Sequence, residues 1–116
     1  MTTIFPEIKS IISPDLDNDK NPQDPLDCSI PIEVEIGIKG KEGADLFQLT
    51  VVTIQCLQRR RETFWGKGYL ITPSFSWNIV RESLEKMLMH CSGESWNDVA
   101  IKISNFLEWE FENYKK

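Results

Sequence analysis

The chain has 116 residues, of which 41% are hydrophobic and 27% charged, and its formal net charge is -5 at pH 7. This length suffices for a single hydrophobic core, so we expect residues 1–116 to form one domain. The negative charge argues against a nucleic-acid partner or an anionic membrane surface, because both are usually bound by a positive field. A basic protein partner is the natural complement of such a charge.

The sequence carries no signal for a membrane or for export. No run approaches the roughly 18 consecutive apolar residues of a membrane span, and residues 1–10 lack the basic region and apolar core of a signal peptide. Cys28, Cys56 and Cys91 are odd in number and widely spaced, which is typical of reduced thiols. We therefore expect a cytoplasmic location.

The first quarter of the chain combines a short strand with an acidic loop. Residues 3–12 contain an apolar set that predicts an edge strand, where Pro6 is tolerated. Residues 13–27, rich in aspartate and proline, favour a loop. Asp15, Asp17 and Asp19 have the spacing that begins a calcium loop of the EF-hand type, but its later glycine and glutamate are missing. We expect a solvated acidic loop without a metal ion.

Period-2 alternation then predicts two strands joined by a hairpin. Apolar residues alternate with polar ones over residues 32–38 and again over residues 47–51, and the glycine-containing segment 40–43 lies between them. The alternation slips near Thr53, which predicts a bulge or the end of the strand. Residues 69–72 predict a short third strand.

Two helices are expected after these strands. Either Ser74 or Ser76 can cap the first helix, and Gly93 is expected to close it in a left-handed conformation. The second helix is expected over residues 94–114, with Ser95 as its N-cap and an apolar stripe that includes Val99, Ile103, Leu107 and Tyr114. Strands followed by helices predict an α+β fold, an antiparallel sheet of three to four strands with two C-terminal helices packed on one face.

Three residues of the second helix break its pattern. Glu110 falls inside the apolar stripe, so we expect it to be buried with a partner, either an arginine such as Arg81 or a backbone amide. Ile101 and Trp109 are large apolar residues outside the stripe. They predict either a partner-binding surface or a position covered by the N-terminal segment, and the sequence leaves both open.

No arrangement of residues predicts an enzyme or a cofactor site. His90 and Cys91 are adjacent, so on a helix they point about 100° apart and cannot share a hydrogen bond. The carboxylates at Glu108, Glu110 and Glu112 are two residues apart and face different directions on a helix. The basic run at residues 59–61 indicates either internal ion pairs and solvated charges or, less favoured in an acidic chain, a nucleic-acid patch.

Several motifs resemble a known family. The motifs are SPDL, IGIKG, DLFQLTVVT and GYLI, together with the ending GESWNDVAIKISNFLEWEFENY, which carries most of the weight. In this combination the chain resembles the immunity protein 8 family, small antitoxins encoded beside bacterial polymorphic toxins. The similarity spans nearly the whole chain and is lost around residues 56–65.

The resemblance implies a protein that binds and neutralises the toxic C-terminal domain delivered by a sister cell, for example by contact-dependent growth inhibition. We therefore expect an immunity protein that forms a heterodimer with a basic toxin domain; the alternative is a small regulatory or adaptor domain with another protein partner. The resemblance implies no catalytic residues. The residues expected to meet the partner are acidic ones that attract it and apolar ones that hold it: Asp15, Asp17, Asp19, Asp24, Asp27, Glu42, Asp45, Ile101 and Trp109.

Overall fold

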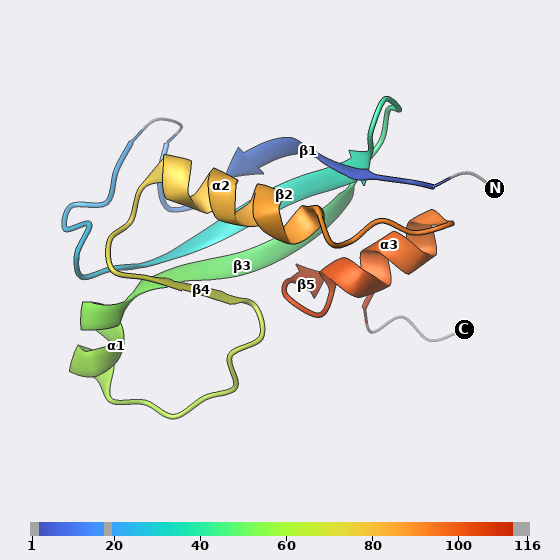
Figure 1. Cartoon of the computed structure of the whole chain (residues 1–116). Helices are drawn as coiled ribbons and strands as arrows, with labels where there is room; N and C mark the ends of the chain where they lie inside the picture. The colour runs from blue at the N-terminus through green and yellow to red at the C-terminus, as the bar shows by residue number, and fades with distance from the viewer. Residues whose placement is uncertain (1–2, 18–19, 113–116) are drawn as a thin grey trace.

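The computed structural model describes residues 3–17 and 20–112 and contains a five-stranded sheet with three helices (Figure 1). The strands are β1 (Pro6–Ile12), β2 (Ser29–Ile38), β3 (Asp45–Thr53), β4 (Tyr69–Thr72) and β5 (Glu108–Trp109), and the helices are α1 (Ile54–Arg60), α2 (Trp77–Leu88) and α3 (Trp96–Ile103). Both α2 and α3 lie on the same side of the sheet in Figure 1. The predicted α+β fold is confirmed.

The sheet is mixed, in the order β1-β2-β3-β4, with β5 paired to β3. The first three strands and β5 pair antiparallel, whereas β4 runs parallel to β3. The expected antiparallel arrangement is therefore wrong for β4. The chain leaves β3 through α1 and returns so that β4 lies beside the last four residues of the same strand, and such a crossover is what parallel pairing requires. Along one edge of β3, β4 covers residues 50–53 and β5 covers residues 47–48.

The hairpin between β2 and β3 forms as the sequence predicted. Gly40 and Gly43 have φ angles of 82° and 93°, in the left-handed region that favours glycine. Gly37 is required for a different reason, because a Cβ at this position would lie 2.1 Å from the carbonyl oxygen of Gly43. On the other side of β2, Pro6 is the first residue of the edge strand β1, a position where a missing N–H is tolerated.

The slip in alternation near Thr53 marks the end of β3 and the start of α1. The Thr53 hydroxyl accepts a hydrogen bond from the backbone N–H of Cys56 at 3.3 Å and so caps this helix. Arg59 and Arg60 lie in its last turn, where the negative end of the helix dipole favours cations. The sequence predicted the strand end but no helix directly after it, so α1 is an addition to the expected fold.

The main core lies between the sheet and the two longer helices. Buried side chains of β2 and β3 pack against Val80, Leu84 and Leu88 of α2 and against Val99 and Ile103 of α3. Ser76 caps α2 by accepting a hydrogen bond from the Ile79 N–H at 3.0 Å, one of the two expected alternatives.

Gly93 does not adopt the expected left-handed conformation. The N–H of Ile4 donates a hydrogen bond to the carbonyl of Gly93 at 2.7 Å, and the N–H of Gly93 donates to the carbonyl of Ile4 at 3.1 Å. A Cβ there would lie 2.9 Å from the Cβ of Asp98. The close approach of the chain to the start of α3 is therefore the physical reason for a glycine.

The expected helix over residues 94–114 is wrong in its second half. Ser95 caps α3 as predicted, but the helix ends at Ile103 and the chain turns back to form β5. The Ser104 hydroxyl donates to the Ile101 carbonyl at 2.7 Å, a local bond that competes with helix continuation. Pairing β5 with β3 satisfies a stretch of sheet edge that a longer helix would leave open. The expected stripe residue Tyr114 lies outside the described residues.

Asp45, at the start of β3, connects α3 and β5 through hydrogen bonds to its side chain. One carboxylate oxygen, Oδ2, accepts a hydrogen bond from the Trp96 indole N–H at 2.7 Å and another from the Trp109 indole N–H at 3.0 Å. The Trp109 ring also stacks on Phe47, with centroids 6.2 Å apart. Trp109 is therefore half-buried by its own chain, against residues of β3, whereas the sequence left open either a partner-binding surface or cover by the N-terminal segment.

Glu110 is exposed, so its expected burial is wrong. The backbone amide expected as one possible partner is present, because Glu110 Oε2 accepts from the Leu46 N–H at 2.6 Å. The Glu110 N–H in turn donates to the Leu46 carbonyl at 3.1 Å. The arginine expected as the alternative, Arg81, lies near Glu85 on its own helix.

Replacing Asp45 should release both indoles. We expect Asp45→Ala to lower the free energy of unfolding by about 2 kcal/mol, because two donors lose a shared charged acceptor. Urea unfolding followed by tryptophan fluorescence measures this loss. The matched control is Glu42→Ala in the same hairpin, which should stay within about 0.5 kcal/mol. An equal loss in both variants would mean that the hairpin, and not the shared carboxylate, determines stability.

Replacing Glu110 tests how β5 is attached. Glu110→Ala should lower the free energy of unfolding by roughly 1 kcal/mol, since an exposed hydrogen bond to a backbone amide is lost while the amide gains water. Glu108→Ala, two residues earlier on β5 and also exposed, is the control and should have a smaller effect. Thermal melts of both variants measure these losses of stability. A cost of about 3 kcal/mol or more for Glu110→Ala would indicate a buried ion pair with an arginine, one of the two partners expected from the sequence.

Candidate partner-binding surface

The acidic residues expected to meet a partner lie in two separate places. Asp15, Asp17 and Asp24 are exposed in the loop before β2, whereas Glu42 is exposed in the hairpin after β2. A strand of ten residues spans roughly 33 Å, so these groups do not form one patch. Asp19 lies outside the described residues.

Two of the expected residues already have partners in their own chain. Asp45 accepts the two indole hydrogen bonds described above. The carboxylate of Asp27 binds Arg59, whose Nε and Nη2 donate at 2.9 and 3.0 Å to its two oxygens. This guanidinium holds the pKa of Asp27 below its usual value. One arginine of the basic run thus pairs internally, while Arg60 and Arg61 are exposed.

A more continuous acidic surface covers the face of the sheet opposite α2 and α3. Side chains of a strand alternate between faces, so the burial of Ile32 and Val34 in the helix-side core places Glu33 and Glu35 on the helix-free face. Glu33 pairs in register with Gln48 of β3, and Gln48 pairs with Glu108 of β5. Glu33, Gln48 and Glu108 are therefore aligned across three strands, with the amide of Gln48 between the two carboxylates.

Short polar contacts hold these side chains in place. The Ser10 hydroxyl donates to Glu35 at 2.9 Å, and the amide of Gln48 donates to Glu33 at 3.5 Å. A hollow of about 310 Å³ lies on this face, and its lining includes Pro14, Pro31, Glu33, Gln48, Tyr69 and Glu108.

Positive charge is scarce in this hollow. Among its described lining residues the one cation is Lys67, which forms an ion pair with Glu112 and lowers the pKa of that carboxyl. The hollow therefore keeps an excess of negative charge from Glu33 and Glu108. We define the acidic face as Glu33, Glu35 and Glu108 with this hollow.

Exposed aromatic and apolar side chains lie on β4 and in the loop before it, and one of them, Tyr69, also lines the hollow. Trp65 is 93% exposed in the loop before β4, and the ring of Phe64 packs on Tyr69 with centroids 4.6 Å apart. Ile71, two residues after Tyr69 on β4, is 52% exposed. Exposed aromatic groups beside a charged surface are typical of protein-binding sites. Of the two apolar residues expected from sequence, Ile101 is exposed on α3 and Trp109 is half-buried.

The sequence contained part of the signal for the acidic face. The alternation over residues 32–38 already placed Glu33 and Glu35 on the wet side of a strand. Glu108 could not be added to them, because the pattern around it predicted a helix. Its position depends on the pairing of β5 with β3, which no local pattern specifies.

The described residues contain no cluster of three or more His, Cys, Asp or Glu placed to hold a metal ion. Within residues 3–17 and 20–112, none of the helices has the length and apolar character needed to cross a bilayer. Cys56 and Cys91 are buried, Cys28 is half-buried, and burial raises the pKa of Cys28 and of Cys91. The raised pKa favours the protonated, weakly nucleophilic form of the Cys28 and Cys91 thiols.

Comparison with known proteins agrees with the motifs. The model of the family described as Immunity protein 8 matches residues 6–114, a span that includes every strand and helix of the fold. No curated protein and no solved structure matches the chain. Since the match covers nearly all of the 116 residues, the chain belongs to the immunity protein 8 family and is an immunity protein.

Proposed function

We propose that this protein neutralises a cognate toxin domain in the cytoplasm by forming a heterodimer with it and covering a surface that the toxin needs. Family membership supports the general role. The acidic face supports the specific mode of action, because it offers negative charge and a hollow to a partner.

The toxin domain is proposed to be basic where it meets the acidic face. Charge complementarity across an interface mainly accelerates encounter and excludes wrong partners, while buried apolar contacts determine how long the complex lasts. Glu33 and Glu108 line the same hollow as Tyr69, and the ring of Phe64 packs on Tyr69, so both kinds of contact are available on adjoining surfaces. This proximity is the observation that carries the proposal.

The proposed role is tested by expressing the chain together with the toxin domain encoded beside it. The two proteins should co-purify as a complex of equal stoichiometry, and cells that produce the toxin domain should grow only when the chain is present. Light scattering after size exclusion gives the stoichiometry. Growth arrest despite a well-folded chain, with no complex formed, would contradict the proposal and favour the adaptor alternative.

Neutralising the acidic face should slow association. The triple variant Glu33→Gln, Glu35→Gln, Glu108→Gln should lower the association rate by about tenfold at low salt and flatten its salt dependence, because charges steer encounter over a Debye length of about 8 Å. The dissociation rate should change less. Stopped-flow fluorescence at several salt concentrations measures both effects.

The control variant carries the same change in net charge elsewhere. Glu82 and Glu85 are exposed on α2, and Glu94 is exposed directly before the N-cap of α3, so their replacement by glutamine should slow association much less. An equal effect of the two triple variants would show that overall charge, and not the acidic face, governs encounter.

A further inference from the structure

The outer edge of β4 is open for strand pairing. β4 is the last strand in the sheet order, and the N–H of Thr50 donates to the Gly68 carbonyl at 2.8 Å. Backbone groups alternate in direction along a strand, so Leu70 and Thr72 also face β3, whereas Tyr69 and Ile71 face away from it. The Tyr69 N–H donates to Gly66 within the preceding turn. The described residues provide no backbone partner for the Tyr69 carbonyl or for the N–H and carbonyl of Ile71.

This edge lacks the features that protect the other edge of the sheet. β1 begins with a proline, and its pairing with β2 shifts in register between Ile8 and Ser10, beside the charged Lys9. Prolines, charges and such irregularities prevent unwanted strand pairing. β4 has the sequence YLIT, without charge or proline, and the side chain of Ile71 is 52% exposed. With four residues, β4 is also the shortest of the strands that lie in the main order of the sheet.

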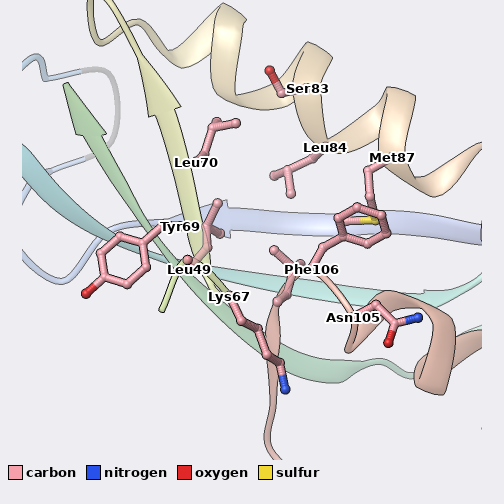
Figure 2. A pocket seen from close by; sticks show the side chains of 11 residues that line it. Leu49, Lys67, Tyr69, Leu70, Ser83, Leu84, Met87, Asn105 and Phe106 are labelled. Carbon is pink, nitrogen blue, oxygen red and sulfur yellow. The ribbon is translucent and has the colours of Figure 1, made fainter. Parts of the chain in front are cut away.

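An apolar pocket of about 340 Å³ lies beside β4 on the helix side of the sheet. Figure 2 shows Leu49 and Leu70 from the sheet, Leu84 and Met87 from α2, and Phe106 from the turn after α3 around this space. The ring of Tyr69 points away from it in the same view. Phe106 is 52% exposed, so the pocket opens to solvent at an apolar rim.

We propose that the toxin domain inserts an extended segment here, which pairs with the outer edge of β4 as an added strand and places a large apolar side chain in this pocket. The inference rests on the proposed function and specifies how the partner is held. In this mode of recognition, backbone hydrogen bonds supply affinity and a pocket for alternate side chains supplies specificity. β4 offers both within four residues.

The two faces beside β4 also specify the chemistry of the segment. Alternate side chains of an added strand would point to the apolar pocket and to the helix-free face. On that second face Glu108 lies next to the start of β4, with Oε2 3.1 Å from the position of a Cβ on Gly68. A lysine or arginine complements this carboxylate. The expected toxin segment therefore alternates apolar and cationic residues.

Proline at position 71 tests the backbone part of the inference. Ile71→Pro removes an N–H that faces away from β3, so the β3–β4 hydrogen bonds are kept. We expect about a tenfold or greater loss of affinity for the toxin domain, mostly through faster dissociation. Ile71→Thr keeps the N–H, favours a strand and shortens the apolar side chain, so it should lose much less. Circular dichroism and thermal melts of the free variants establish that both are folded.

Two further measurements complete the test. The amide hydrogen of Ile71 should exchange at least about tenfold more slowly in the complex than in the free wild-type chain, because it gains a partner only there. Ser83→Phe, on the α2 side of the pocket, should weaken binding by filling space that the toxin side chain needs.

The possible outcomes separate this inference from the proposed function. Unchanged affinity for the toxin domain in Ile71→Pro, together with an Ile71 amide that gains no protection in the wild-type complex, would overturn the strand pairing and leave the immunity role intact. A free chain that dimerises in sedimentation and becomes monomeric in Ile71→Pro would assign the edge to a second copy and also overturn the inference. Absence of any wild-type complex would overturn both proposals.

Discussion

The need to pair the backbone of β3 on both sides is the constraint on which the rest of the fold depends. β2 covers one edge of this strand along most of its length, but no single element covers the other edge. Two short segments share it, β4 arriving parallel after a crossover and β5 arriving antiparallel from the end of the described chain. Asp45 then holds β5 in place, because one oxygen of its carboxylate accepts a hydrogen bond from an indole of α3 and another from an indole of β5. Backbone pairing and side-chain hydrogen bonding therefore support each other at the same end of β3.

The arrangement leaves the two faces of the sheet with different roles. The helix side is filled by α2 and α3, and its buried residues contribute to stability in proportion to the apolar area removed from water. The helix-free face keeps its polar residues exposed and carries Glu33, Glu35 and Glu108. The edge at β4 connects the two faces, since its side chains alternate between the apolar pocket and the acidic face. In the proposed complex, a single extended segment of the partner that pairs with β4 would contact both the apolar pocket and the acidic face.

The sequence predicted the elements whose signals are local. The alternation over residues 32–38 and 47–51, the glycines of the hairpin and the Ser76 cap each depend on neighbours in the chain, and each prediction is confirmed. The second half of the expected C-terminal helix failed because Trp109 and Phe111 also favour strands, and the open edge of β3 decides between the two. The direction of β4 likewise depends on where the chain crosses the sheet. The candidate surface was predictable only in part for the same reason: Glu33 and Glu35 follow from alternation, whereas Glu108 joins them through pairing between distant strands.

The position of β5 in the sequence has a consequence for synthesis on the ribosome. Gln48 of β3 emerges roughly 60 residues before its partner Glu108, so at a typical rate of about 5 to 20 residues per second the nascent chain waits about 3 to 12 seconds to complete this edge. During that interval Asp45 also lacks both of its indole donors. Translation thus exposes an incomplete β3 edge, and the native sheet can close only after the C-terminal segment has left the exit tunnel.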